Sequence, residues 1–371
     1  MNILIITHEY PPVGGGGATA CKYLSREFHN LGHTVTIVTS QFSDFPKEST
    51  QDGVRIFRIK SLRKKKDTSS FHEMLSFVVS AFVFTDQLCR RDSFDACLVF
   101  FGIPSGPIAL HLKKKYKIPY TVRFGGGDIP GSQKRYGIIY RILNPINRSI
   151  WKNAHNLVAN SESLRERALS FDNTNDIRII SNGVDSERYT RKIPYNCGKE
   201  IRLLFVSRLI EGKGLQYVIP YMKLINERSK RRVTLTIVGD GPFRNALEGM
   251  VGEDNKEYVS FAGRRENEDL LNLYENANIF ILPSLSEGMP NVVLEAMSME
   301  LPIIMTDCGG SKELISGNGC VVGIDKFVDT VIEMCRNDER LSEYSRKSRE
   351  RVIEYFSWKE KAVEYLRLID E

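Results

Sequence analysis

Two cations follow a predicted strand in the second half of the chain, in positions suited to a phosphorylated ligand. Arg208 and Lys213 come after the apolar segment 201–207, and glycines stand at 212 and 214 beside the lysine. An arginine can hold two phosphate oxygens at once and a lysine adds a compact charge, so the pair could neutralise the charge on a departing diphosphate. The plainer alternative is two surface cations.

Two glutamates flank the start of a predicted helix after the apolar segment 279–282. Pro290 and Asn291 suit a helix start, so Glu287 lies in the preceding loop and Glu295 within the helix. Free backbone N–H groups near Asn291 can receive a phosphate. Each carboxylate could bind hydroxyls, one those of a sugar and the other those of a ribose. A capped helix with ordinary surface glutamates has the same spacing.

A run of four glycines, Gly14–Gly17, follows the first predicted strand and precedes a predicted helix. Glycines expose backbone N–H groups to a phosphate, and the helix N-terminus adds positive potential. The run is neither G-x-G-x-x-G nor a P-loop, so it indicates neither NAD binding nor ATP hydrolysis. A flexible turn needs fewer glycines, so phosphate contact is favoured.

Alternating strands and helices must position these groups. The predicted strands of the first half are 2–7, 35–39, 54–59, 96–100, 120–124, 157–159 and 177–180. Those of the second half are 201–207, 233–238, 259–261, 279–282 and 303–305. Strands separated by helices predict parallel sheets with helices on both faces. Ligands bind beyond the carboxyl ends of such strands, where all three groups lie.

The length of 371 residues favours two domains. The polar segment 186–200 lacks periodicity and reads as a linker, after which the strand pattern restarts. We therefore predict an α/β protein with Rossmann-like, doubly wound domains at 1–190 and 200–356, facing each other across a cleft. An apolar stripe from Trp358 to Ile369 predicts a final helix, 357–371, that joins the first domain.

Composition predicts a cytoplasmic protein that can associate with the inner face of the cell membrane. Hydrophobic residues make up 42% of the chain and charged residues 26%, which is typical of a globular protein. The longest apolar run, 74–85, is too short to span a bilayer, and no signal peptide is visible. Seven scattered cysteines without a C-x-x-C pair indicate reduced thiols, no disulfides and no structural zinc.

Basic clusters stand at 63–66, 113–117 and 228–232, within a net charge of +6. Any one of them is most simply a solvated face. The first directly precedes the apolar stretch 71–84, and this combination favours an anionic membrane surface, contacted through the N-terminal domain. Aromatic residues are not interleaved with the cations, so nucleic acid is not an expected partner.

The whole chain resembles family 4 of the retaining glycosyltransferases, which have the GT-B fold. The motifs that carry the resemblance occur in order along the chain: the Pro11-Pro12 and glycine loop, Gly32-His33-x-Val35, Asn182-Gly183-Val184-Asp185, Ser207-Arg208 with Lys213-Gly214, Gly239-Asp240-Gly241-Pro242, and the glutamate pair Glu287 and Glu295. Each motif alone is weak, and the combination is specific.

The resemblance implies that the second domain binds a nucleotide-sugar donor. Arg208 and Lys213 would hold the diphosphate, Glu295 the ribose and Glu287 the donor sugar, with Met289 and Asn291 in the same segment. Gly15 and Gly16 would close over the phosphates from the first domain, which would bind the acceptor. The last helix would cross back to that domain.

The resemblance also implies transfer with retention of configuration, without an enzyme-bound metal or other cofactor. The chain contains no Asp-x-Asp, and side-chain cations could neutralise charge instead. We interpret Glu287 as a positioning residue rather than a covalent nucleophile. The expected acceptor is a hydroxyl of a glycan or lipid-linked molecule in cell-envelope polysaccharide synthesis. A nucleotide-sugar 2-epimerase and a non-catalytic nucleotide-sugar-binding partner are the alternatives.

One position departs from the family. Many relatives carry a histidine in the loop after the strand 120–124, where this chain has glycines at 125–127 and Asp128. Asp128 or Arg123 could take the place of that histidine, and we include Asp128 among the catalytic candidates. Alternatively, the glycines form the turn and Asp128 caps the next segment. His8 could line the site, whereas His33 reads as structural.

Overall fold

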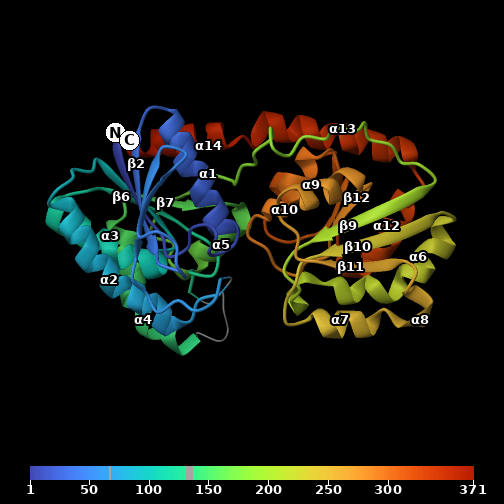
Figure 1. Ribbon diagram of the computed structural model, residues 1–371, viewed down its shortest axis with the longest axis horizontal. Coiled ribbons are helices and arrows are strands. Elements are labelled where there is room, and N and C mark those ends of the chain that lie inside the picture. Colours follow the sequence, from blue (N-terminus) through green and yellow to red (C-terminus); the bar gives the residue numbers. More distant parts are fainter. Residues whose placement is uncertain (67, 131–136) are drawn as a thin grey trace. The chain divides into compact units, whose positions relative to one another are not determined.

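The computed structural model describes residues 1–66, 68–130 and 137–371 and divides the chain into two compact units. The first unit contains residues 1–182 and 358–371, and the second contains residues 183–357. Figure 1 follows the chain from blue to red through both units. Each unit is an α/β domain with its own sheet and its own core.

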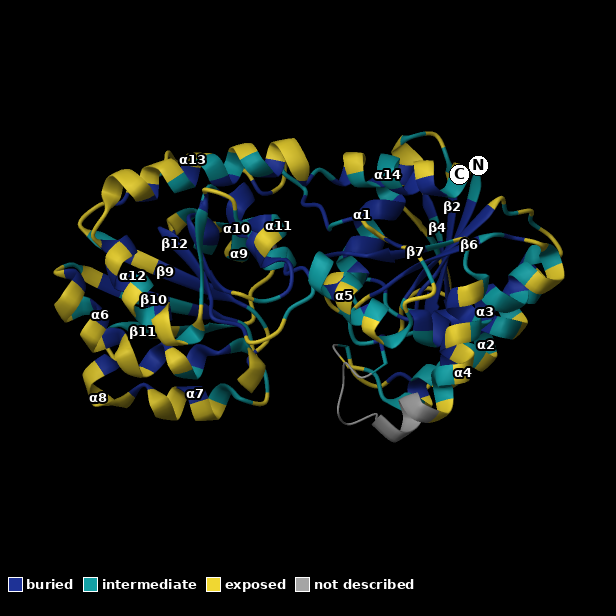
Figure 2. Ribbon diagram, turned by 180° about the vertical axis from the view of Figure 1, so that it is seen from behind, coloured by how far each residue is buried: buried dark blue, intermediate teal, exposed yellow. Residues whose placement is uncertain are grey.

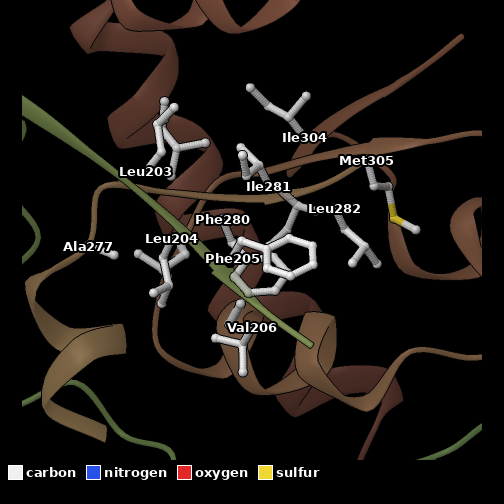
Figure 3. Close-up of a cluster of buried hydrophobic side chains, with 14 of the residues drawn as sticks. Leu203, Leu204, Phe205, Val206, Ala277, Phe280, Ile281, Leu282, Ile304 and Met305 are labelled. Carbon is white, nitrogen blue, oxygen red and sulfur yellow. The ribbon is translucent and has the colours of Figure 1, made fainter. Parts of the chain in front are cut away.

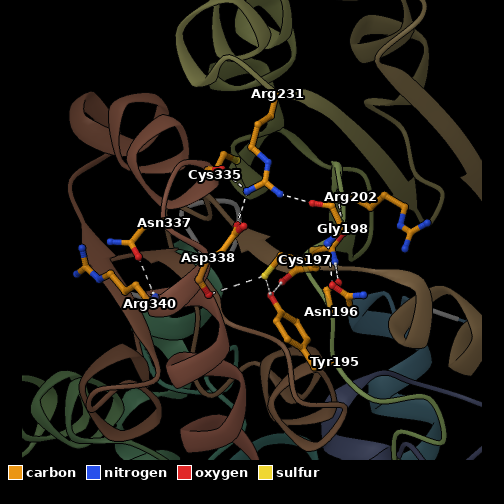
Figure 4. Close-up of polar contacts among 11 residues, drawn as sticks. Tyr195, Asn196, Cys197, Gly198, Arg202, Arg231, Cys335, Asn337, Asp338 and Arg340 are labelled. Atoms are coloured by element: carbon orange, nitrogen blue, oxygen red, sulfur yellow. Dashed lines mark hydrogen bonds and ion pairs between the residues drawn. The ribbon is translucent and has the colours of Figure 1, made fainter.

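The boundary lies earlier than the 190–200 predicted from sequence, because the polar segment 186–200 is bound to the second unit. Arg191 donates to the carbonyl oxygen of Met299 at 3.1 Å, and Tyr195 donates its hydroxyl to the carbonyl of Asn278 at 2.8 Å. Arg231 bonds both Gly198 and Asp338 (Figure 4). These hydrogen bonds join side chains to backbone carbonyls and need no hydrophobic periodicity. The segment therefore has the sequence pattern of a linker, although it is held against the second unit.

The first unit contains an eight-stranded sheet in the order β3-β4-β2-β1-β5-β6-β7-β8. Its strands are β1 (Asn2–Ile6), β2 (Thr34–Ser40), β3 (Glu48–Gln51), β4 (Val54–Ile59), β5 (Ala96–Phe100), β6 (Tyr120–Arg123), β7 (Asn156–Ala159) and β8 (Ile177–Ile179). All pairs are parallel except β3 with β4. The sequence analysis missed β3, because this edge strand is polar and mostly exposed and so lacks an apolar signal.

Helices cover both faces of this sheet. These are α1 (Gly16–Asn30), α2 (Phe71–Cys89), α3 (Gly102–Tyr116), α4 (Gly137–Asn153), α5 (Glu162–Phe171) and α14 (Trp358–Asp370). Residues of α1 and α14 share one buried cluster, in which Trp358 stacks on Tyr23 with ring centroids 5.9 Å apart. Residues of α2, α3, α4 and α5 share the cluster on the other face, and Figure 2 shows the exposed outer sides of these helices.

Helix α3 begins at Gly102, directly after β5. Ile103 is not helical, so Pro107 lies in the first turn, where its missing N–H removes no helical hydrogen bond.

The second unit contains six parallel strands in the order β11-β10-β9-β12-β13-β14. They are β9 (Glu200–Val206), β10 (Arg232–Val238), β11 (Val259–Gly263), β12 (Ile279–Leu282), β13 (Ile303–Thr306) and β14 (Gly319–Val322). Figure 3 shows the apolar side chains of β9, β12 and β13 that pack in its core. The edge strand β14 was not predicted, since its residues are only partly buried.

Helices and short 3-10 turns connect these strands. The helices are α6 (Met222–Ser229), α7 (Arg244–Met250), α8 (Gly252–Asn255), α9 (Asn267–Asn276), α10 (Asn291–Ser298), α11 (Ser311–Leu314), α12 (Phe327–Cys335) and α13 (Asp338–Tyr355). The turns are η2 (Glu211–Lys213), η3 (Leu215–Tyr217), η4 (Ile219–Tyr221) and η5 (Ile324–Lys326).

Both sheets are doubly wound, as predicted, so each has one point where the strand order reverses. That point lies between β1 and β5 in the first unit and between β9 and β12 in the second. Loops leave the two strands in opposite directions there and open a crevice at their carboxyl ends, which is where ligands bind in open α/β sheets. The site is therefore sought in the loops after these four strands.

Candidate active site

Lys213 and Glu287 meet at the reversal point of the second sheet. Lys213 ends η2 after β9, and Glu287 lies in the loop after β12. The lysine Nζ donates to the glutamate Oε1 at 2.5 Å, and both side chains are largely buried. The structure thus brings together two of the predicted site residues from distant parts of the chain.

Backbone contacts fix the two loops that carry this pair. The N–H of Leu285 donates to the carbonyl of Gly212 at 2.8 Å. Gly214 has φ +76°, and a Cβ there would lie 1.9 Å from the carbonyl oxygen of Pro283. Only glycine allows this approach, so Lys213-Gly214 joins the loops as well as supplying a cation.

Arg208 lies on the same loop without a partner. It is exposed, and within residues 1–66, 68–130 and 137–371 the structure gives its guanidinium no hydrogen bond or ion pair. Its neighbours are fixed, since Ser207 donates to Val238 and Leu209 donates to Asp240 through backbone N–H groups. A cation held at its backbone but free at its tip can bind an anion without first breaking an ion pair.

The Gly239-Asp240-Gly241 loop after β10 packs directly against the backbone at Arg208. Gly239 has φ +136°, and a Cβ there would lie 1.9 Å from the oxygen of Ser207. A Cβ at Gly241 would lie 2.2 Å from the oxygen of Leu209. These glycines position the Arg208 loop, which explains a motif that the sequence analysis noted without assigning it a role.

Glu295 lies in α10 and contacts a buried tyrosine. The hydroxyl of Tyr274 donates to Oε2 of Glu295 at 3.0 Å. Burial raises the pKa of Glu295 to about 7, although hydrogen bonds from Tyr274 and Tyr189 act to lower it. The carboxyl is therefore balanced between its neutral and charged forms near neutral pH.

The segment between the two glutamates enters α10 as predicted. Pro290 is the N-cap and Asn291 is the first helical residue. Met289 is buried beside Gly310, where a Cβ would lie 3.1 Å from the methionine sulfur. Asn291 thus lies at the N-terminus of α10, and Met289 packs against Gly310.

The glycine run lies at the reversal point of the first sheet. Gly15 is the exposed N-cap of α1 and Gly16 is its first residue. The Gly14 N–H donates to the carbonyl of Lys66 at 2.9 Å, which ties the run to the segment after β4. The glycine run therefore contains the first backbone N–H groups of α1.

Arg63 holds this segment and was missed as a site residue. Its side chain is 2% exposed and donates to the carbonyls of His8, Lys65 and Lys66. It also lies 3.4 Å from a carboxylate oxygen of Glu9. The sequence analysis treated 63–66 as a solvated basic cluster, and nothing in four adjacent cations indicates which one is buried.

Asp128 organises the loop after β6. One carboxylate oxygen accepts from the N–H of Gly102 at 2.7 Å, and the other accepts from Gly125 and Gly126 at 2.9 Å each. Burial raises its pKa, while these bonds oppose the rise. The carboxylate therefore binds the glycine loop before it and the first residue of α3, rather than capping the next segment as the sequence alternative proposed.

Arg123 is buried inside the first unit. Its guanidinium donates to the side chain of Asn182 and lies 5.0 Å from the ring centroid of Phe100. It is only 3% exposed, so its side chain makes its contacts inside the first unit. The arginine ties β6 to the last residue of the first unit before the chain enters the second.

His8 and His33 have different surroundings. His8 follows β1 and packs edge-on against Phe101, and burial lowers its pKa to about 4, so it is neutral at neutral pH. His33 precedes β2 in the turn after α1, where its N–H donates to Phe28 at 3.1 Å. His8 therefore lies near the glycine run, and His33 belongs to a turn.

Among the described residues, no three or more His, Cys, Asp and Glu side chains are grouped to hold a metal ion. In the same residues, no helix is both long enough and apolar enough to cross a bilayer.

The fold and the site together define a class. Two doubly wound units carry glycine loops and helix N-termini at their reversal points, and the second adds cations beside a carboxylate. This combination is typical of proteins that bind phosphorylated nucleotides and act on them.

Comparison with known proteins gives the family. The model described as "Glycosyltransferase Family 4" matches residues 14–188, and that described as "Glycosyl transferases group 1" matches residues 200–337. The chain belongs to the family 4 type of glycosyltransferases, and it is therefore a transferase.

Individual relatives agree with this assignment. An uncharacterised glycosyltransferase of Methanocaldococcus jannaschii is 26% identical over 96% of this chain and 95% of its own length. The amylovoran biosynthesis glycosyltransferase AmsK of Erwinia amylovora is 29% identical over 60% of this chain and 56% of its own. Relatives of this chain thus include an enzyme of polysaccharide biosynthesis.

A solved structure shares the fold. HepE of Anabaena, crystallised in complex with UDP, superposes with a TM-score of 0.76 at 15% identity, covering 100% of both chains. This similarity confirms the predicted GT-B fold, which is built from two Rossmann-like units.

Proposed function

We propose that this protein transfers a sugar from a nucleotide-sugar donor to a hydroxyl of a glycan or lipid-linked acceptor, with retention of anomeric configuration. The observation that carries the proposal is the Lys213–Glu287 pair at the reversal point of the second sheet, with the free guanidinium of Arg208 on the same loop as Lys213. The UDP bound to HepE and the polysaccharide role of AmsK support a nucleotide sugar and a glycan.

The second unit binds the donor in this proposal. Arg208 and Lys213 hold the diphosphate, and their charge neutralises the leaving group, so an enzyme-bound metal is not required for that step. Glu287 faces the donor sugar, and its contact with Lys213 holds the carboxylate in place. Glu295 binds the ribose hydroxyls beside the N-terminus of α10.

The chemical step follows from this placement. The acceptor hydroxyl attacks the anomeric carbon on the face from which the diphosphate leaves, and the departing phosphate oxygen takes the hydroxyl proton. The bond from the anomeric carbon to the diphosphate breaks as the new glycosidic bond forms. Glu287 stabilises the positive sugar ring.

The first unit binds the acceptor and contacts an anionic membrane surface. Leu75, Val79 and Val83 lie on one side of α2 and are 53%, 61% and 58% exposed. Exposed Lys64 and Lys65 precede this helix. Apolar side chains beside cations match the interface of a membrane with acidic lipids.

A donor screen tests the function. The full chain is incubated with UDP-, GDP- and ADP-sugars, with and without membrane lipid extract, and both the thermal midpoint and nucleotide release are followed. One donor should stabilise the protein, with release that depends on lipid. Release without acceptor would instead indicate an epimerase or a hydrolase, and stabilisation without turnover on any acceptor would indicate a binding partner.

Vesicle binding tests the membrane surface. The chain should sediment with phosphatidylcholine vesicles only when phosphatidylglycerol is included. Replacing Leu75, Val79 and Val83 by Ser should weaken binding about tenfold or more, because three apolar side chains leave the interface. Ile353→Ser removes an equally exposed residue of α13 in the second unit and serves as the control. Equal binding by the triple variant would refute this surface.

A further inference from the structure

Phe101 has a backbone conformation that side chains rarely adopt. It directly follows β5, at the reversal point of the first sheet, with φ +72° and ψ 123°. A non-glycine residue is strained at such angles, and such residues cluster at functional sites. A glycine would avoid this strain, so the phenyl ring itself is the feature to explain.

The ring is fitted between two glycines that come from neighbouring loops. A Cβ at Gly17, in the first turn of α1, would lie 2.7 Å from the ring, and a Cβ at Gly125 would lie 2.1 Å from it. The His8 ring meets Phe101 edge-on, with centroids 4.9 Å apart. The loops after β1, β5 and β6 therefore all meet at this ring, which remains only half-buried.

Asp128 fixes the frame around the ring. Its carboxylate accepts from the N–H of Gly102, the residue after Phe101, and from those of Gly125 and Gly126. Two strand ends are thereby tied together through one buried side chain. Asp128 is a positioning residue in this arrangement, and Phe101 is the apolar surface that it positions.

We propose that Phe101 forms the floor of an acceptor subsite in the first unit, where its ring takes the apolar face of a pyranose. The inference rests on the proposed transferase function and names the class of acceptor, a neutral sugar. An aromatic ring has a negative face that attracts the slightly positive C–H groups of a sugar ring. Neither glycine adds a side chain that would cover the ring, and the imidazole of His8 is neutral.

Ligand-observed NMR on the full chain tests the subsite, with methyl α-glucoside, methyl α-galactoside and methyl α-mannoside as probes and glycerol as the non-cyclic control. Phe101→Leu keeps an apolar side chain but removes the flat face, so the Kd for the bound glycoside should rise about twofold to tenfold. Phe101→Tyr keeps the face and should bind as wild type does.

A matched control lies at the other end of the same strand. Phe94 precedes β5 and is also half-buried, so Phe94→Leu should leave glycoside binding unchanged. Gly17→Ala provides a second variant, since it favours helix α1 while its methyl group displaces the ring. It should weaken glycoside binding even if Phe101→Leu proves unstable.

The outcomes separate this inference from the proposed function. Wild-type glycoside affinity in both Phe101→Leu and Gly17→Ala would overturn the subsite, as would the absence of glycoside binding to wild type. UDP, GDP and ADP are titrated in parallel, and their affinities should be equal in wild type and Phe101→Leu. If no nucleotide or nucleotide sugar binds at all, the proposed function fails instead.

Discussion

Arg208 and Lys213 lie on one loop but differ in what holds their side chains. Lys213 is paired with Glu287, whereas no described residue bonds the guanidinium of Arg208. An exposed, unpaired cation contributes little to folding. Arg208 therefore has little effect on folding stability, and its expected role is to bind a ligand.

Arg208→Ala should therefore separate function from stability. We expect the thermal midpoint to stay within experimental error and turnover of the donor to fall on the order of 10²–10³, since one source of leaving-group stabilisation is lost. Arg202→Ala is the control, because Arg202 is an exposed arginine of β9, the strand before this loop, and lies away from its carboxyl end. Wild-type turnover in Arg208→Ala would remove this residue from the site.

The pKa of Glu295, raised to about 7, predicts a pH dependence of donor binding. Ribose hydroxyls donate to a charged carboxylate more strongly than to a neutral one, so nucleotide affinity should rise as the pH increases through about 7. Titration of the identified nucleotide by calorimetry between acidic and basic pH measures this rise. Glu295→Gln should bind more weakly at high pH and show a flat profile, and a sloping profile in that variant would contradict the assignment.

The same pKa shift has a consequence for folding. In the unfolded chain the Glu295 carboxyl ionises near its ordinary pKa of 4.5, whereas in the folded protein it keeps its proton up to about 7. Since the folded state binds the proton more tightly, this group's contribution to stability is present at low pH and is lost as the pH rises through about 7. Donor binding and stability thus change in opposite directions at this residue.

Among the elements, the loop after β10 supports the donor site without touching a ligand. Gly239→Ala places a methyl group against the carbonyl oxygen of Ser207 at a φ of +136°, so we expect a loss of about 2–4 kcal/mol in the free energy of unfolding. Because the displaced segment carries Arg208, donor affinity should fall as well. Chemical denaturation and nucleotide titration measure the two effects.

A second glycine nearby gives the opposite expectation. Gly249 lies in helix α7, and a Cβ there would meet nothing within 4 Å. Gly249→Ala should raise stability by about 0.5–1 kcal/mol through helix propensity and leave donor affinity unchanged. Similar losses in both variants would mean that the contact with Ser207 is not what Gly239 provides.

The sequence predicted the parallel sheets because buried strands are continuous apolar runs with helical segments between them. It also placed Arg208, Lys213 and Glu287 after strand ends, and the sheet order brought the lysine and the glutamate together. It could not find Arg63 or Phe101. Burial of one cation among four, and a left-handed backbone at a phenylalanine, depend on tertiary contacts that no local pattern encodes.

For the whole molecule, helices α13 and α14 are consecutive in sequence but belong to the cores of different units. Phe356 and the helix α13 before it belong to the second unit, whereas Trp358 begins α14 in the first. Consecutive segments of the chain thus stabilise different units. Each unit has its own core, so unfolding should occur in two transitions rather than one.

Scanning calorimetry of two variants tests this division. Trp358→Ala removes a nearly buried ring that stacks on Tyr23, and it should lower the transition of the first unit through a loss of about 3–5 kcal/mol. Leu341→Ala in α13 should lower only the transition of the second unit, by about 2–5 kcal/mol. A nucleotide that binds the second unit should raise that transition alone. If Trp358→Ala moved the nucleotide-sensitive transition instead, the donor would depend on the first unit, and the division of roles proposed for the two units would have to be reversed.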